Sequence, residues 1–304
     1  MAKLPALDWE KDAADWPHRQ ASEFIEAGGV HWHLQRMGAG PSCLLLHGTG
    51  ASTHSFAGLM SALAREFSVL AVDLPGHGFT SRPKELSGLS MPGMALALQT
   101  LLVKLEIEPR WVIGHSAGAA IACSMTLAGM LQPAGIVSIN GALLPLSGFK
   151  HPAVTPMLRK VASSDWLAGW FADRLRKPAA VERLLAQTGS QLDRQSLDWY
   201  ARLARTPSHA GAAMAMMAVW DPRPLERDLP ALTVPLLLLV GAEDRMILPG
   251  EATKVQRLVK DSTLVQLAGL GHLAHEEAPQ RVADEILKFT HRQRQGVPSG
   301  AVTS

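Results

Sequence analysis

One serine stands between two glycines at residues 114–118, in the string GHSAG. The string follows an apolar run and precedes an alanine-rich stretch, which predicts a tight turn from a strand into a helix. Glycine suits both flanks, because a side chain there would collide with neighbouring backbone. The Ser116 hydroxyl would then stand clear of the strand, at a helix start that favours developing negative charge. We therefore predict that Ser116 is a nucleophile.

A serine nucleophile needs a base that takes its proton, and the base needs a carboxylate that orients it. In a strand–turn–helix protein of this kind, the acid is expected directly after a late strand. Residues 236–244 (LLLLVGAED) place two acidic residues after an apolar run. We favour Asp244 as the acid over its neighbour Glu243.

The base is expected in a loop after the last strand, where residues 269–272 (GLGH) offer a flexible turn and an imidazole. His275 is the competing histidine, but it falls on or beside the last predicted helix. The order serine, acid, histidine along the chain is the one that this architecture uses. Ser116, Asp244 and His272 are therefore predicted to form a catalytic triad.

Acyl transfer also needs N–H donors for the developing oxyanion. Residues 47–50 (HGTG) follow the first buried apolar run. We predict that the oxyanion hole consists of the backbone N–H groups of Thr49 and Ala117. A second glycine-rich string, residues 73–78 (DLPGHG), is interpreted as a structural turn without a chemical role. Neither string has the Lys-Ser/Thr pair of a phosphate-binding loop.

The predicted catalytic and oxyanion residues follow short apolar runs. These runs predict the strands of a parallel sheet that helices cover on both faces. A hairpin over residues 21–38 is predicted to precede them. The expected strands are 43–46, 69–72, 111–113, 136–139, 236–240 and 264–267, and the expected helices are 56–66, 94–105, 117–128 and 279–290. These elements predict the α/β-hydrolase fold, with a mostly parallel eight-stranded sheet.

The alternation of apolar strands and helices is absent between residues 144 and 228. Helices are predicted there at 156–175, 179–187, 196–203 and 210–220. We interpret residues 144–228 as a helical cap inserted into a core domain of residues 1–143 and 229–304. The cap would lie over the carboxyl edge of the sheet, where such folds bind ligands.

Large apolar side chains of the cap are candidates for a substrate pocket, because methionine and aromatic groups make adaptable apolar walls. Ordinary packing of the cap onto the sheet is the alternative. The predicted pocket residues are His115, Trp166, Trp170, Met214, Met217 and Trp220. The expected substrate is small and apolar.

Other histidines suggest metal sites only weakly. His31 and His33 share a strand face, which is more typical of a half-exposed polar face than of a metal pair. His272 and His275 have the spacing of a pair but lack a third ligand. His209 is either an axial ligand for a metalloporphyrin or, more commonly, a turn residue. We predict no metal and no cofactor.

Composition limits the partners and the compartment. The net charge of +2 comes without a basic stripe, so nucleic acid is not an expected partner. The N-terminal residues lack a secretory signal, and the apolar runs are too short to cross a membrane. Cys43 and Cys123 fit small core residues in a reducing compartment, which predicts a cytoplasmic protein.

Beyond these motifs, the chain resembles the BchO proteins, the magnesium-chelatase accessory proteins of bacteriochlorophyll synthesis. The likeness extends over about residues 16–290, including the cap. The strings that carry it are 47–56 (HGTGASTHSF), 73–83 (DLPGHGFTSRP), 114–121 (GHSAGAAI), 139–146 (INGALLPL), 220–230 (WDPRPLERDLP) and 269–279 (GLGHLAHEEAP). The resemblance implies a role near insertion of Mg²⁺ into protoporphyrin IX in a photosynthetic bacterium, with magnesium chelatase as a partner.

Two functions follow. The first is a serine hydrolase that cleaves an ester or related acyl bond, associated with the magnesium-chelatase step. The second is a non-catalytic accessory protein whose cap binds a porphyrin, or its ester, or the chelatase. Haloalkane dehalogenation is disfavoured, because it needs a carboxylate where Ser116 stands. Cofactor-free perhydrolase and hydroxynitrile-lyase reactions use the same triad and stay open.

Overall fold

A computed structural model describes residues 4–145, 165–175 and 177–295. Within them the strands form an eight-stranded sheet in the order β1-β2-β4-β3-β5-β6-β7-β8. The strands are β1 Ser22–Ala27, β2 Val30–Met37, β3 Ser42–Leu46, β4 Ser68–Val72, β5 Trp111–His115, β6 Gly135–Ile139, β7 Leu236–Gly241 and β8 Ser262–Leu267. Strand β2 pairs antiparallel with β1 and with β4, and the remaining pairs are parallel. The hairpin and the mostly parallel sheet are confirmed.

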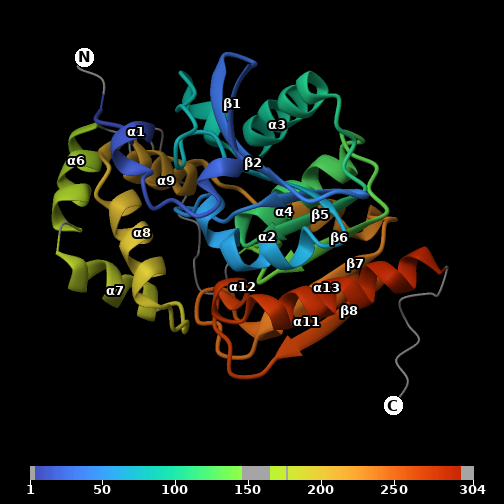
Figure 1. Ribbon diagram of the computed structural model, residues 1–304. Coiled ribbons are helices and arrows are strands. Elements are labelled where there is room, and N and C mark those ends of the chain that lie inside the picture. The colour runs from blue at the N-terminus through green and yellow to red at the C-terminus, as the bar shows by residue number, and fades with distance from the viewer. Residues whose placement is uncertain (1–3, 146–164, 176, 296–304) are drawn as a thin grey trace.

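Helices cover both faces of the sheet (Figure 1). Alternate residues of β3 show why: Leu44 and Leu46 pack into one buried cluster, and Cys43 and Leu45 pack into another. The first cluster includes α3 (Met91–Leu105) and α4 (Ala117–Leu127), and the second includes α2 (Ala57–Leu63) and α13 (Pro279–Arg294). Burial on both faces explains why the strand sequences are almost continuously apolar.

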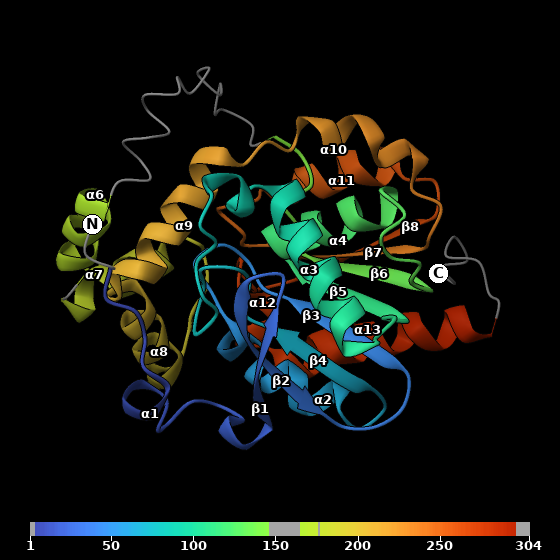
Figure 2. The same ribbon diagram turned by 90° about the horizontal axis from the view of Figure 1, so that it is seen from above.

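Between β6 and β7 in sequence, a group of helices lies beside the carboxyl ends of the strands (Figures 1 and 2). They are α6 (Asp165–Arg174), α7 (Pro178–Ala186), α8 (Arg194–Ala204) and α9 (Pro207–Val219). These four helices belong to the described part of the segment 144–228 that we interpret as the cap. The predicted helix 156–175 falls partly outside the described residues. Helix α10 (Arg223–Asp228) and a 3-10 turn (Leu229–Ala231) lead back to β7.

The N-terminal segment runs from the sheet edge to the cap, which the sequence did not predict. It contains α1 (Trp9–Asp12) and a 3-10 turn (Arg19–Ala21). Its Asp15 carboxylate accepts two hydrogen bonds from the guanidinium of Arg202 on α8, at 2.6 and 3.0 Å. The ring of Trp16 contacts the rings of Phe79 and Trp199, 5.0 and 6.5 Å away. The segment thus ties the cap to the core.

Several short elements were also missed. Helices α11 (Pro249–Leu258) and α12 (Ala274–Glu277) flank β8, and 3-10 turns occupy Thr53–Phe56 and Leu86–Leu89. Val255 is the buried residue of α11 and Leu258 is partly buried, so the apolar pattern of this helix is short. Within the described ranges, none of the helices is both long enough and apolar enough to span a bilayer.

Candidate active site

Ser116 occupies the sharp turn between β5 and α4. Its backbone has φ 51° and ψ −115°, a conformation that L-residues rarely adopt. The turn is held by neighbours, since Ser116 N–H donates to the Ile139 carbonyl and Ala142 N–H donates to the Ser116 carbonyl, both at 3.0 Å. A Cβ on Gly118 would lie 2.0 Å from the Leu46 carbonyl oxygen. The predicted strained turn, with glycine required beside it, is what the structure contains.

The side chains of Asp244 and His272 meet in the loops after β7 and β8. His272 Nδ1 donates to Asp244 Oδ2 at 2.8 Å, and both residues are buried. The other carboxylate oxygen accepts the N–H groups of Met246 and Ile247, at 2.7 and 2.9 Å. Because Nδ1 carries the proton, His272 Nε2 has its lone pair available as a base. Among the described residues, the Ser116 hydroxyl has no hydrogen-bond partner.

Asn140 is a further residue at this site, which the sequence did not reveal. It directly follows β6 and has φ 47°, in the left-handed region. Its side-chain N–H donates to Asp244 Oδ2, and its side-chain oxygen accepts Gly241 N–H at 3.4 Å. Asn140 therefore helps to hold the carboxylate in place. A polar residue directly after a buried strand was the signal that could have found it.

His115, which we predicted to line a substrate pocket, is buried beside the His272 loop. Its ring is 2% exposed, and Nε2 donates to the His272 carbonyl at 3.0 Å. The ring lies 4.8 Å from the His272 ring and 4.4 Å from the His275 ring, between centroids. Burial holds the pKa of His115 well below its ordinary value, so the ring is neutral. His115 therefore supports the His272 loop through this hydrogen bond and these ring contacts.

The loop predicted to hold the oxyanion lies directly against the nucleophile. A Cβ on Gly48 would come within 3.0 Å of Ser116 Cβ. His47 fixes this loop, since its Nε2 accepts Leu74 N–H at 2.9 Å and its Nδ1 donates to the Gly48 carbonyl at 2.8 Å. Within the described residues, neither Thr49 N–H nor Ala117 N–H has an acceptor. Both groups are thus free to donate to an oxyanion.

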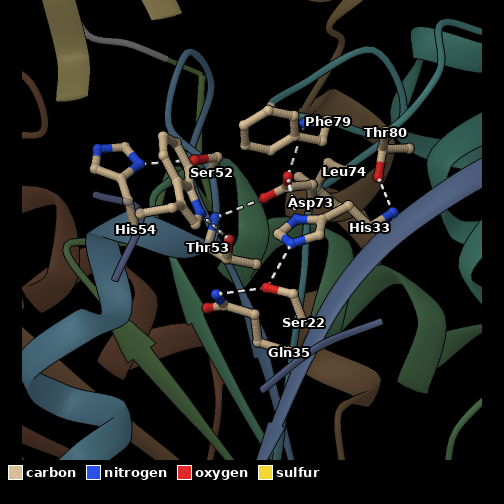
Figure 3. Close-up of polar contacts among 12 residues, drawn as sticks. Ser22, His33, Gln35, Ser52, Thr53, His54, Asp73, Leu74, Phe79 and Thr80 are labelled. Atoms are coloured by element: carbon tan, nitrogen blue, oxygen red, sulfur yellow. Dashed lines mark hydrogen bonds and ion pairs between the residues drawn. The ribbon is translucent and has the colours of Figure 1, made fainter. Parts of the chain in front are cut away.

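The turn at residues 73–80 carries a buried carboxylate that joins three segments (Figure 3). Asp73 accepts hydrogen bonds from His33 Nδ1 at 2.7 Å, Thr53 N–H at 2.7 Å and Phe79 N–H at 2.9 Å. Burial alone would raise the pKa of Asp73, but His33 and the N–H donors lower it below the usual range. The turn thus supports the segment that follows the oxyanion loop, in agreement with a structural role.

His31 and His33 do not form the half-exposed face that the alternating pattern suggested. His33 is fully buried, with its ring 5.0 Å from Trp9 and 5.4 Å from Phe79. His31 is exposed and bonds Glu26 at 2.7 Å. The N-terminal segment covers one of the two histidines, which strand periodicity alone does not predict.

A turn of the cap also contacts the loops of the acid and the base. The Thr188 carbonyl accepts the N–H groups of His272 and Arg245, both at 3.2 Å. Ser190 Oγ accepts Leu273 N–H at 2.8 Å. A Cβ on Gly189 would lie 2.0 Å from the Glu243 carbonyl oxygen, so the two backbones touch. This contact joins segments that are distant in sequence, and no local pattern predicts it.

The cap residues that we predicted to line an apolar pocket differ from one another in how deeply they are buried. Met216 faces the core: it is fully buried, and its Sδ accepts the Thr49 hydroxyl at 3.4 Å. Met217 is 59% exposed, and Trp170 is 43% exposed and lies 4.3 Å from the Arg174 guanidinium. Met214 and Trp220 are half-buried. The side chain of Trp166 lies outside the described residues. One residue along a helix turns a side chain by about 100°, which separates Met216 from Met217.

Comparisons with known proteins agree with the fold. The sequence model of the alpha/beta hydrolase family matches residues 43–285. The chain is 34% identical to the magnesium-chelatase 30 kDa subunit of Rhodobacter capsulatus over 91% of this chain and 96% of the relative. It is 27% identical to the AB hydrolase superfamily protein YisY of Bacillus subtilis, over 85% of this chain and 94% of the relative. The structure of an alpha/beta hydrolase fold protein from Burkholderia ambifaria superposes with a TM-score of 0.74 at 22% identity, covering 88% of this chain and 97% of that one.

Proposed function

We propose that this chain, which belongs to the alpha/beta hydrolase family and within it to the family of the magnesium-chelatase 30 kDa subunit, is a serine hydrolase that acts on an ester or related acyl bond. The observation that carries the proposal is the buried pair of His272 and Asp244, joined at 2.8 Å. This bond leaves His272 Nε2 as the acceptor of the Ser116 proton. The oxyanion loop against Ser116 supports the same chemistry.

In the first half-reaction, Ser116 Oγ attacks the acyl carbon while His272 Nε2 takes the hydroxyl proton. The carbonyl oxygen becomes an oxyanion that accepts hydrogen bonds from Thr49 N–H and Ala117 N–H. Asp244 stabilises the imidazolium, which then gives its proton to the leaving alkoxide. Water attacks the resulting acyl-serine by the same steps in reverse, and the acid product leaves Ser116 with its proton restored.

The most direct test compares the wild-type protein with Ser116→Ala in hydrolysis of short p-nitrophenyl esters. Loss of one oxyanion donor alone lowers kcat by about 10²- to 10³-fold, and loss of the nucleophile should remove acyl-enzyme turnover altogether. Ser68→Ala, exposed at the start of β4, is the matched control and should keep full activity. Equal hydrolysis by wild type and Ser116→Ala would exclude Ser116 from the reaction.

We further propose that the protein works at the magnesium-chelatase step, with an apolar substrate such as a porphyrin ester. Its 34% identity to a magnesium-chelatase 30 kDa subunit supports this assignment. The second candidate, an accessory protein that binds porphyrin or the chelatase through its cap, is favoured by the exposed Trp170 and Met217. Restoring pigment synthesis to a strain without the native gene separates the two: Ser116→Ala fails if catalysis is needed and succeeds if binding suffices.

A further inference from the structure

His209 is a buried cap residue that bridges three segments. It lies in the first turn of α9 and is 3% exposed. Its Nδ1 accepts Gly78 N–H at 3.0 Å, and its Nε2 donates to the Gly50 carbonyl at 3.1 Å. Both ring nitrogens therefore form hydrogen bonds, so neither is available as an axial ligand to a metal. His209 is also a helix residue and not the turn residue that the sequence suggested. The ring connects the cap to the oxyanion loop and to the turn at residues 73–80.

A second contact from the same helix lies beside the first. Met216 follows His209 by seven residues, so the two share a face of α9. Met216 Sδ accepts the Thr49 hydroxyl, while His209 holds the Gly50 carbonyl. A Cβ on Gly76 would lie 2.6 Å from Ala212 Cβ on this face, which shows how closely the helix approaches the core. Helix α9 thus touches the oxyanion loop on both sides of the Thr49–Gly50 peptide.

One further hydrogen bond, from Ala51 N–H to the Gly48 carbonyl at 3.2 Å, closes the turn that contains Gly50, but no side chain packs on its Cβ side. The φ of Gly50 is 78°, and no atom lies within 4 Å of the place where a Cβ would stand. A glycine without packing is free to change its backbone angles unless hydrogen bonds fix them. His47 anchors the loop on the core side, through Leu74 N–H. On the cap side, the anchor of the Gly50 carbonyl is His209.

We propose that His209 is a positioning residue for the oxyanion hole, so that the cap as well as the core aims Thr49 N–H at the reacting carbonyl. The inference rests on the proposed serine-hydrolase function. An oxyanion donor acts only if it is held near the position of the developing charge. Burial supports the role as well, since it lowers the pKa of His209 to about 4 and keeps the ring neutral at working pH.

Two substitutions separate the two hydrogen bonds of the ring. In His209→Gln the amide nitrogen falls near the place of Nε2 and keeps a donor for the Gly50 carbonyl. In His209→Asn the amide oxygen falls near the place of Nδ1 and keeps only the acceptor for Gly78 N–H. We expect His209→Asn to lower kcat for p-nitrophenyl esters about 10- to 100-fold with KM little changed, and His209→Gln to stay within about threefold of wild type. A purely structural role would affect both variants alike.

Tyr200→Phe is the matched control for weakening the cap elsewhere. The Tyr200 hydroxyl donates to Glu276 Oε1 at 2.7 Å, and phenylalanine keeps the ring that packs in one cluster with Ala51. This variant should lose thermal stability and keep kcat. Equal kcat in His209→Asn and His209→Gln, or a loss in Tyr200→Phe as large as that in His209→Asn, would overturn the proposal.

Hydrogen exchange gives a readout that does not require catalysis. Ala51 N–H donates to the Gly48 carbonyl at 3.2 Å and closes the oxyanion loop. Its exchange should be faster in His209→Asn than in His209→Gln, and equal exchange would contradict the positioning role. Absence of esterase activity in the wild type would count against the proposed function, while the exchange experiment would still decide whether His209 holds the loop.

Discussion

Lowering the pH from 7.0 to 5.5 perturbs a group of buried imidazoles around the candidate site. Burial lowers the pKa of His54 to about 3, of His209 to about 4 and of His275 to about 3. The same groups titrate near 6.5 in an unfolded chain. The unfolded state therefore binds more protons between pH 6.5 and these lower values. Protons favour the state that binds more of them. The free energy of unfolding therefore decreases as the pH is lowered across this window.

The size of the loss follows from proton linkage. Each of these three histidines removes slightly more than ~1 kcal/mol between pH 7.0 and 5.5, or about 4 kcal/mol together. Burial also lowers the pKa of His47, His77 and His115, which adds to the loss. Glu276 acts in the opposite direction, because burial raises its pKa to about 8. Proton uptake by the folded carboxyl returns about 2 kcal/mol over the same interval, so the net loss is at least about 2 kcal/mol.

Urea denaturation followed by tryptophan fluorescence, at pH 7.0, 6.2 and 5.5 and constant ionic strength, measures this change. His275→Asn should reduce the loss by about 1 kcal/mol, because it removes one buried imidazole. The control His31→Asn, at an exposed position, should leave the loss unchanged. A free energy of unfolding that stays constant or rises between pH 7.0 and 5.5 would refute the assignment of these histidines as neutral and buried.

Further predictions concern three residues. Glu276→Gln should raise the free energy of unfolding by about 3 kcal/mol at pH 7 and by more at pH 8.5, because the amide removes a buried group that ionises on unfolding. Urea denaturation that shows no gain in stability at either pH would contradict this prediction. Ser116→Gly should be more stable than Ser116→Ala by about 1 kcal/mol in calorimetry, because glycine adopts φ 51° without strain, and equal melting temperatures would contradict the strained turn. In Asn140→Gly the glycine can adopt the left-handed backbone, but the hydrogen bond to Asp244 is lost. The kcat for esters should therefore fall about tenfold or more with KM unchanged. An unchanged kcat would exclude Asn140 from positioning the acid.

Much of the core could be predicted from the sequence because its signals are local. The six residues of β7 are all buried, and the run LLLLVG reports this directly. The turn at Ser116 needs glycine on both sides for steric reasons that apply before any tertiary contact forms. Chain order then places His272 and Asp244 in loops at the same edge of the sheet. The structure brings these two side chains together as expected.

The supporting contacts could not be predicted, because they join segments that are distant in sequence. His115, Thr188 and His209 act through backbone groups of other loops, which carry no residue-specific signal. Helix α9 was ambiguous for another reason. Its sequence PSHAGAAMAMMAV has no charged face, so periodicity does not decide which methionine faces the core. The structure buries Met216 in the core, whereas we predicted Met214 and Met217 as pocket residues and made no prediction for Met216.

Covalent capture tests most directly whether Ser116 is a nucleophile that His272 and Asp244 activate. The folded protein is treated with a fluorophosphonate, and the adduct is mapped by peptide mass spectrometry. We expect one adduct, on the peptide that contains Ser116, which is absent in Ser116→Ala and forms much more slowly in Asp244→Asn. An adduct on a different residue, or a folded wild-type protein that resists the reagent as fully as Ser116→Ala does, would contradict this expectation.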